Sequence, residues 1–405
     1  MPVFTVNNGY FYKDGNPIQL KGISWSGAES NTLFPHCWNN SYQAMVQKFK
    51  NSGGNFIRLP ITKEIFLSGE LTGTDGAINP GYTDNLAIKN IQPLLAFDTL
   101  CNYLASQQIY FIFDWHTPQK SQVPGSAAFG QPFGVNGVSE SQWIGYMTQL
   151  ATRYTSNGYF LGIEPANEPH RFKWDDSNDS TNWRRAAEVC GQAILNANPN
   201  ILVFIEGVAA HGSNCNVNPV TFMNWGTELR AFACYPIRPS FIPKNKLVLC
   251  PHPYGPNVLY ANSGSFAGLV DSSSFPNNLP TEWQNQFGFL ADQGYTLCYT
   301  EYGGMLIDKA GGNASLNQKD KDFQYKLIDW SASKNIFAMN LWMMTNEGGD
   351  TSGLLQDDMS SYNSQTNTLF QYQASKYVPP TTVVNPPNPP AGGNTIAKLL
   401  IYQTT

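Results

Sequence analysis

The chain has 405 residues, of which 41% are hydrophobic and 13% aromatic, enough to bury the core of one large domain. Only 13% are charged, and Asp plus Glu outnumber Lys plus Arg by 29 to 24, which gives a net charge of −5. Because a protein that neutralises phosphates needs a basic excess, this balance argues against a nucleic-acid partner. A chain rich in neutral polar and aromatic side chains suits a neutral, hydroxyl-rich ligand better.

Short apolar runs alternate with amphipathic stretches eight times along the chain. The runs are rich in Val, Ile, Leu and Phe with little polar alternation, as is typical of parallel strands covered on both faces. They lie at 18–25, 55–61, 110–116, 160–167, 202–208, 246–254, 296–302 and 337–343. Helical patterns separate most of them, at 41–52, 88–107, 139–156, 183–197, 281–293, 318–334 and 360–377. This order predicts an α/β fold, a (β/α)8 TIM barrel with long loops at its C-terminal face, rather than an open doubly wound sheet with a Gly-rich first turn.

The composition changes after residue 377. Residues 1–378 are predicted to form the barrel domain, and 379–393 a stiff Pro-rich linker. The segment 394–405 is too short for a domain, so we interpret it as a tail or as the start of a truncated second module. No run of 18 or more apolar residues occurs, and we therefore expect no membrane-spanning helix.

The predicted strands end in polar or aromatic side chains, although charged residues are scarce in this chain. In chain order the ends carry Arg58, Asp114 and His116, Asn167 and Glu168, Glu206, His252 and Tyr254, Glu301, and Trp342. Barrel enzymes hold their catalytic groups at the carboxyl ends of the strands, so we expect the active site at this rim. We interpret Asp114 as bracing the barrel and Glu206 as a hydrogen-bond partner of Arg58.

Glu168 and Glu301 follow the fourth and seventh predicted strands, on opposite sides of the same barrel mouth. Glycoside hydrolysis needs such a pair, since one carboxyl group protonates the leaving oxygen and the other attacks the anomeric carbon. Tyr302, Arg58 and His252 are the expected neighbours that keep Glu301 ionised and orient it as the nucleophile. Glu168 is then the acid/base, with Asn167 beside it to hold a sugar hydroxyl. The histidines show no metal-binding spacing, so we expect neither a metal nor a cofactor.

Six short motifs carry a resemblance to a known family. In chain order they are NFIRLP with Arg58, DWH with His116, GIEPANEP with Asn167 and Glu168, PHPYG with His252 and Tyr254, TEYGG with Glu301, and NLWMM with Trp342. Together they resemble glycoside hydrolase family 5 of clan A, over residues 5–377. KGISWSGAE and EGGDTSGLLQDD are similar to its bacterial cellulases that carry a linker and a carbohydrate-binding module. Tyr302 replaces the usual Phe, and the loops 117–138 and 209–245 are long.

The resemblance implies a retaining endo-β-1,4-glucanase that hydrolyses cellulose or cello-oligosaccharides by double displacement. It implies that His252 and Tyr254 position the nucleophile. The alternatives keep the fold and the mechanism but act on mannan, mixed-linkage glucan or xyloglucan, or release cellobiose from chain ends. A non-catalytic carbohydrate-binding barrel would normally lose one of the two carboxylates. A serine esterase would need a Gly-x-Ser-x-Gly pattern, which the sequence does not contain.

Aromatic residues near the strand ends are candidate platforms for sugars, because flat rings stack on the apolar faces of sugar rings. We assign Trp342 to the sugar at the cleavage point. Trp25, Trp38 and Trp225 are expected to form the outer subsites, and His116 is a further substrate-binding candidate.

Cys215 and Cys234 flank a long loop, and a disulfide that closes it would fit a secreted protein. Four other cysteines lie in predicted elements and are interpreted as buried free thiols: Cys101, Cys190, Cys250 and Cys298. We expect an extracellular monomer whose signal peptide is not part of this sequence, because the first residues lack the basic and apolar regions of such a peptide.

Overall fold

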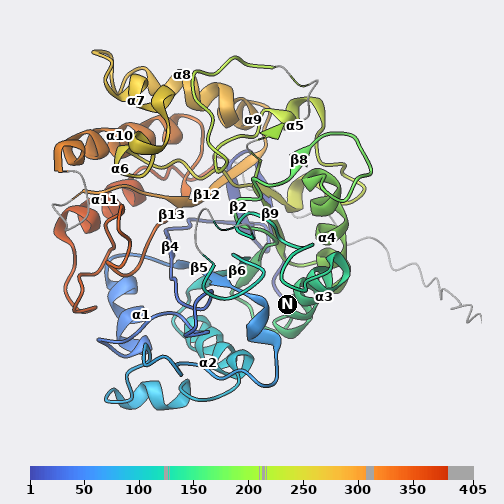
Figure 1. The fold of residues 1–405 in the computed structure, drawn as a ribbon, viewed down its shortest axis with the longest axis vertical. Helices are drawn as coiled ribbons and strands as arrows, with labels where there is room; N and C mark the ends of the chain where they lie inside the picture. Colours follow the sequence, from blue (N-terminus) through green and yellow to red (C-terminus); the bar gives the residue numbers. More distant parts are fainter. Residues whose placement is uncertain are drawn as a thin grey trace, which may run out of the picture.

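The structure, a computed structural model, describes residues 1–122, 126, 128–208, 210–211, 215, 217–306 and 314–381. Its centre is a closed barrel of eight parallel strands in the order β11-β12-β13-β4-β5-β6-β7-β9 (Figure 1). They are β4 (Gly22–Ser24), β5 (Phe56–Ile61), β6 (Tyr110–Trp115), β7 (Phe160–Glu164), β9 (Leu202–Ile205), β11 (Leu247–Leu249), β12 (Thr296–Tyr302) and β13 (Ala338–Leu341). Every residue of these strands is buried, which explains the unbroken apolar runs. Each predicted run contains one strand, and the predicted barrel is confirmed.

Helices surround the strands (Figure 1). The longer ones are α1 (Tyr42–Asn51), α2 (Pro93–Ser106), α3 (Glu140–Arg153), α4 (Trp183–Ala197), α10 (Ala314–Ser333) and α11 (Ser364–Ser375). Between β11 and β12 the chain forms α6 (Pro256–Leu259), α7 (Gly264–Val270), α8 (Leu279–Trp283) and α9 (Phe289–Asp292). Local sequence explains where helices begin: α2 has Pro93 in its first turn, and Ser139 and Gln142 form a capping box at the start of α3.

The long loop 209–245 carries little regular structure, as expected. Its described part contains α5 (Ala231–Cys234) and β10 (Ala210–His211), which pairs with β8 (Lys173–Trp174). A disulfide joins Cys215 to Cys234, with Cα atoms 5.7 Å apart, so the predicted bond is present. The cysteines interpreted as buried thiols are free and buried, and so is Cys37.

A small antiparallel sheet precedes the barrel, formed by β1 (Phe4–Asn7), β2 (Tyr10–Lys13) and β3 (Asn16–Ile18). Phe4, Val6 and Phe11 pack in one hydrophobic cluster with Phe56 and Tyr110, the first residues of β5 and β6. The sheet therefore covers the end of the barrel at which the strands begin. Sequence patterns did not predict it, because each of its strands has at most four residues.

Helix α11 ends at residue 375, and the described chain ends at residue 381. The predicted linker from residue 382 onward and the predicted tail or module at 394–405 lie outside the described residues. Within the described residues, no helix combines the length and the hydropathy that a membrane span requires.

Candidate active site

Arg58 lies at the centre of the site, fully buried in β5. Its Nε donates to Glu164 at 2.5 Å, its Nη1 to Glu301 at 2.5 Å, and its Nη2 to Oδ1 of Asn167 at 2.8 Å. Nη2 also lies 3.0 Å from a carboxylate oxygen of Asp114. Burial disfavours the charge, but the surrounding carboxylates outweigh this effect and raise the pKa of Arg58. The barrel interior thus contains a permanent cation.

Glu301 lies near the end of β12, where the pairing with β13 shifts register. The hydroxyl of Tyr254 donates to its Oε2 at 2.5 Å, and Arg58 donates to its Oε1. Burial disfavours the carboxylate, but the electrostatic influence of His252, the charge of Arg58 and the hydrogen bond from Tyr254 outweigh burial and lower the pKa of Glu301. Glu301 therefore has the ionisation that a nucleophile needs.

Glu168 lies in the turn after β7 with a φ of 43°, a left-handed conformation that strains a residue with a Cβ. Its Oε2 accepts the indole N–H of Trp225 at 2.7 Å, and its Oε1 lies 3.1 Å from Nδ1 of His252. One oxygen of Glu168, one oxygen of Glu301 and a ring nitrogen of His252 all lie within 4.8 Å of one another. The two carboxyl groups singled out from the sequence thus meet at the mouth of the barrel.

Below these carboxyl groups lie buried polar residues that sequence reasoning missed or misplaced. Nε2 of His252 lies 2.9 Å from Oγ1 of Thr300, whose hydroxyl donates to Glu164 at 2.5 Å. Glu206, expected to bond Arg58, lies 3.9 Å from that guanidinium, and no described residue donates a hydrogen bond to its carboxyl oxygens. Burial raises the pKa of Glu206 well above its usual range. A lone acid within the apolar run 160–167 was the available signal for Glu164.

His116 and Trp342 form another side of the mouth, with their rings stacked at a centroid distance of 5.6 Å and an angle of 7°. Nδ1 of His116 lies 2.8 Å from Oδ2 of Asp114. Burial favours the neutral imidazole, but the charge and the hydrogen bond of Asp114 outweigh it and raise the pKa of His116 to about 9. His116 is therefore a cation at neutral pH.

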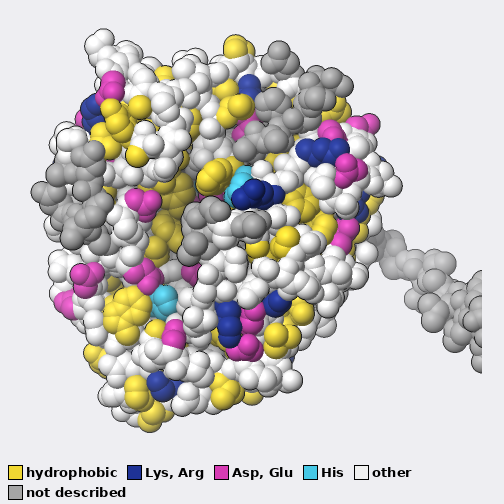
Figure 2. Space-filling view, in the orientation of Figure 1, with side chains coloured by type: hydrophobic (Ala, Val, Ile, Leu, Met, Phe, Trp, Pro, Cys, Tyr) yellow, Lys and Arg dark blue, Asp and Glu magenta, His cyan; other side chains and the backbone are white. Residues whose placement is uncertain are grey.

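The mouth opens into a cavity of about 690 Å³, within the range of ligand sites. Its lining includes Glu29, His116, Asn167, Glu168, Trp225, Tyr254, Glu301, Trp342 and Asp350. On the face seen in Figure 2, the charged side chains are dispersed in small groups over a largely uncharged surface. Such a surface offers hydroxyl, amide and aromatic contacts rather than an electrostatic potential of one sign.

The tryptophans expected to bind sugars do not share one environment. Trp225 and Trp342 line the cavity. Trp38 is half-buried, and its ring lies 5.0 Å from the ring of His36. The expectation for Trp25 is wrong: its side chain is 0% exposed, and its indole N–H donates to the backbone carbonyl of His36. Trp25 is part of the core and offers no face to a sugar.

Two groups of site residues have the spacing of metal ligands: Glu168, His252 and Glu301, and Glu164, Glu206 and His252. Apart from Glu206, these residues already engage in the hydrogen bonds described above, and the guanidinium of Arg58 supplies the countercharge for them. We therefore interpret both groups as parts of one acid–base cluster.

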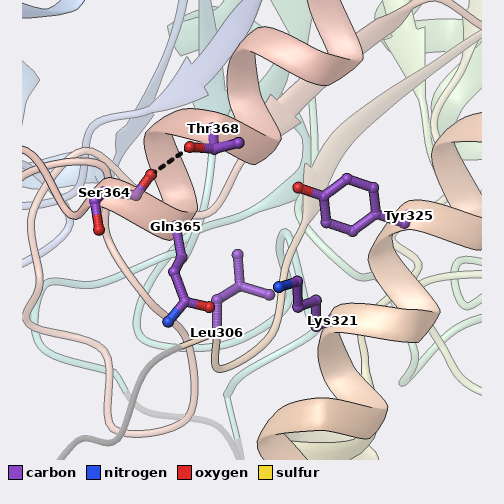
Figure 3. Close-up of a pocket in the computed structure, with 6 residues that line it drawn as sticks. All are labelled: Leu306, Lys321, Tyr325, Ser364, Gln365 and Thr368. Carbon is purple, nitrogen blue, oxygen red and sulfur yellow. Dashed lines mark hydrogen bonds between the residues drawn. The ribbon is translucent and has the colours of Figure 1, made fainter.

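A separate hollow of about 190 Å³ lies between α10 and α11 (Figure 3). It is lined by Leu306, Lys321, Tyr325, Ser364, Gln365 and Thr368. The hydroxyl of Thr368 bonds back to the carbonyl of Ser364 within its own helix. The catalytic candidates do not border this hollow, and we assign it no function.

Comparison with known proteins places the chain among sugar-cleaving enzymes. A family model described as Cellulase (glycosyl hydrolase family 5) matches residues 11–348. The chain is 30% identical over 372 residues to the major extracellular endoglucanase of Xanthomonas campestris pv. campestris, over 91% of this chain and 70% of that protein. It is 30% identical over 369 residues to an endoglucanase of Paenibacillus polymyxa, over 88% and 84% of the two chains.

Solved structures agree with these sequence matches. The catalytic domain of the major endoglucanase from the same Xanthomonas pathovar has a TM-score of 0.79 and 28% identity, over 92% of this chain and 99% of that one. An endocellulase from Pyrococcus horikoshii in complex with cellotetraose has a TM-score of 0.79 and 26% identity, over 92% and 98%. The match to the family model spans all the strands that carry the site.

Proposed function

The chain belongs to the cellulases of glycosyl hydrolase family 5, and on that premise we propose that it is an endo-β-1,4-glucanase that cleaves internal glucan bonds with retention of configuration. The observation that carries the proposal is the pair Glu168 and Glu301, two buried carboxyl groups with oxygens within 4.8 Å of each other at the floor of an open cavity. Their contacts differ: Glu301 accepts hydrogen bonds from Arg58 and Tyr254, whereas Glu168 accepts one from Trp225 and lies beside His252.

In the first step, ionised Glu301 attacks the anomeric carbon and forms a glycosyl-enzyme ester. The glycosidic carbon–oxygen bond breaks, and Glu168 gives its proton to the departing oxygen. Arg58 and Tyr254 hold one oxygen each of the nucleophile, so its orientation is set before the substrate arrives.

In the second step, Glu168 takes a proton from a water molecule, which attacks the same carbon and releases Glu301. Two displacements return the original configuration. The distance supports this course, because retaining enzymes separate their carboxyl groups by about 5–5.5 Å, whereas inverting enzymes leave roughly 6.5–9.5 Å for a water molecule. The separation within 4.8 Å lies on the retaining side.

The other residues at the mouth of the barrel are proposed to bind the substrate. Because Oδ1 of Asn167 accepts from Arg58, its amide nitrogen remains to donate to a sugar hydroxyl beside the reacting carbon. Trp342 and His116 present stacked rings to the same cavity and suit the sugar at the cleavage point. The endoglucanase names of the relatives and the cellotetraose bound to one related structure support a β-1,4-glucan substrate.

We further propose that the protein acts outside the cell as a monomer. The disulfide between Cys215 and Cys234 supports an oxidising compartment, and one relative is named as extracellular. Size-exclusion chromatography with light scattering tests the oligomeric state.

The experiment measures viscosity loss and products on carboxymethylcellulose, mannan and xylan for the wild type and for Glu168→Gln and Glu301→Gln. Glu140→Gln is the matched control, since Glu140, the first residue of α3, forms an ion pair with Arg185 of α4 and does not line the cavity. Rapid viscosity loss on the cellulose derivative, abolished in the two site variants and kept in the control, is expected. NMR of the first-formed anomer is expected to show retention.

Other outcomes separate the alternatives. Slow viscosity loss with release of cellobiose indicates exo action, and activity confined to mannan or another β-glucan replaces the substrate while keeping the mechanism. Full activity in Glu301→Gln, or an inverted first product, overturns the proposed mechanism.

A further inference from the structure

A continuous line of hydrogen bonds joins the two carboxyl groups through the interior of the barrel. From Glu168 it passes through His252 and Thr300 to Glu164, and from there through Arg58 to Glu301. Thr300 and Glu164 are fully buried, and the proposed mechanism gives them no role.

The direction of these hydrogen bonds is set from the Arg58 end. A guanidinium only donates, so Oε2 of Glu164 accepts its Nε–H at 2.5 Å. Burial raises the pKa of Glu164, and the charge and the N–H of Arg58 oppose this rise by stabilising the carboxylate. Oε1 of Glu164 therefore accepts the single hydrogen of the Thr300 hydroxyl, at 2.5 Å.

Oγ1 of Thr300 has then only lone pairs left for His252, so Nε2 must carry the hydrogen in their 2.9 Å contact. In a neutral imidazole this leaves Nδ1 as an acceptor, and it faces Oε1 of Glu168 at 3.1 Å. Two acceptors do not form a hydrogen bond. This contact is favourable only when Glu168 and His252 hold one proton between them.

We propose that Thr300 is a positioning residue, which fixes the tautomer of His252 and thereby retains on Glu168 the proton that this acid donates. The inference rests on the proposed function, because it concerns the acid of that reaction. With its hydrogen on Nε2, the neutral ring of His252 presents a lone pair, instead of an N–H, to the carboxyl group of Glu168.

Three acidic groups face His252 besides Glu168, and none replaces Thr300 as the partner of Nε2. Glu206 approaches Nε2 at 3.3 Å, but its carboxyl oxygens form no hydrogen bond with any described residue. Burial and the neighbouring carboxylates raise the pKa of Glu206, which favours its neutral form. Glu164 lies 4.0 Å from Nε2, and Glu301 lies 3.7 Å from Nδ1, beyond hydrogen-bond distance.

The other groups around Glu168 do not compete for Oε1. Trp225 donates to Oε2 and has no second hydrogen to give. His170 stacks on Trp225, and burial lowers the pKa of His170, so it is neutral. Tyr254 is held by Glu301. The proton between Oε1 of Glu168 and Nδ1 of His252 thus depends on which ring nitrogen of His252 carries the other hydrogen, and Thr300 determines that nitrogen.

The test is the pH profile of kcat/KM on cellotetraose, a neutral substrate, for the wild type, Thr300→Val and Thr300→Ser. Valine keeps the shape but removes the hydroxyl, so His252 is free to carry its hydrogen on Nδ1 and to donate to ionised Glu168. The alkaline limb of Thr300→Val is expected to move to lower pH by about one unit, the size expected for one buried hydrogen bond. Thr300→Ser is expected to retain the wild-type limb, and thermal unfolding reports the integrity of both variants.

A second measurement needs no variant at position 300. The 15N NMR signals of His252, assigned with a His252→Gln variant, are expected to show a hydrogen on Nε2 at all pH values, with Nδ1 losing its share of the proton at the alkaline limb. An Nδ1–H tautomer in the neutral wild-type ring overturns the inference.

The outcomes also separate this inference from the proposed function. A Thr300→Val limb equal to the wild-type limb, or an equal shift in Thr300→Ser, rejects the role of Thr300 while wild-type hydrolysis of cellotetraose still supports the glucanase. A wild type without hydrolytic activity rejects the proposed function itself, whereas the NMR tautomer remains measurable.

Discussion

The indole N–H of Trp225 donates to Oε2 of Glu168 at 2.7 Å, so a residue of the long loop 209–245 holds the proposed acid/base in place. The ring of His170 stacks on the indole at 4.4 Å and 24°. Because an indole only donates, Trp225 orients the carboxyl group without taking its proton. Trp225 therefore serves as a hydrogen-bond donor to the acid/base, in addition to any contact with sugar.

Replacing Trp225 by Phe keeps a flat ring and removes the N–H donor. We expect kcat/KM on cellotetraose to fall about tenfold or more, because Glu168 becomes a carboxylate as it gives up its proton, and a hydrogen bond to a charged group contributes roughly 1.5–3 kcal/mol. Dinitrophenyl cellobioside serves as the control substrate, since its leaving group departs without protonation and should show a much smaller loss. Equal losses on the two substrates would mean that Trp225 acts only as a sugar platform.

The pH dependence should reveal how Tyr254 supports the nucleophile. Glu301 must be ionised to attack, so activity is lost as the pH falls through its pKa. Burial alone would raise that pKa, but His252, Arg58 and the bond from Tyr254 outweigh burial and lower it. In Tyr254→Phe the acid limb of kcat/KM is expected to move to higher pH by about one unit. An unchanged acid limb would show that this hydrogen bond does not set the ionisation of Glu301.

Opening the disulfide should destabilise the protein. The bond spans 19 residues of the loop that carries Trp225. Removing the cross-link from a loop of this size lowers the free energy of unfolding by about 3 kcal/mol. Thermal unfolding with and without dithiothreitol measures the effect. The Cys215→Ser/Cys234→Ser double variant is the control, and its unfolding should not respond to the reductant; a similar response would point to the buried free thiols instead.

The hydroxyl of Tyr302 is buried, and no described residue bonds to it. Replacing Tyr302 by Phe keeps the ring, which packs in the core, and removes the cost of an unpaired polar group. We expect the free energy of unfolding, measured in urea, to stay constant or to rise by about 1 kcal/mol. A clear loss of stability would show that the hydroxyl has a partner in solution, such as a buried water molecule.

The barrel was predictable from sequence because each of its strands is buried on both faces and so appears as an uninterrupted apolar run. The site candidates were predictable because parallel strands place their carboxyl ends on one rim. The choice of Glu168 and Glu301 among the acids of this rim rested in addition on their positions after the fourth and seventh strands and on the motifs GIEPANEP and TEYGG. The N-terminal sheet escaped prediction because its short strands resemble any alternating segment.

Side-chain direction was the part that the sequence did not determine. Trp25 follows β4 directly, and a shift of one residue turns a side chain from the cleft into the core, as happened here. Thr300 lies next to Glu301, but its contact with His252 depends on how the segment that follows β11 lies beside β12. The indole of Trp225 contacts Glu168 from a long loop, and no local sequence pattern predicts the path of that loop.

The N-terminal sheet determines from which end of the barrel solvent can approach the buried carboxyl groups. Phe4, Val6 and Phe11 fill the end of the barrel at which the strands begin, so the cavity at the other end is the open side of the buried carboxyl groups. A substrate chain bound in the cleft would cover the opposite end, so the buried polar residues between the two ends would then be shielded from bulk water on both sides.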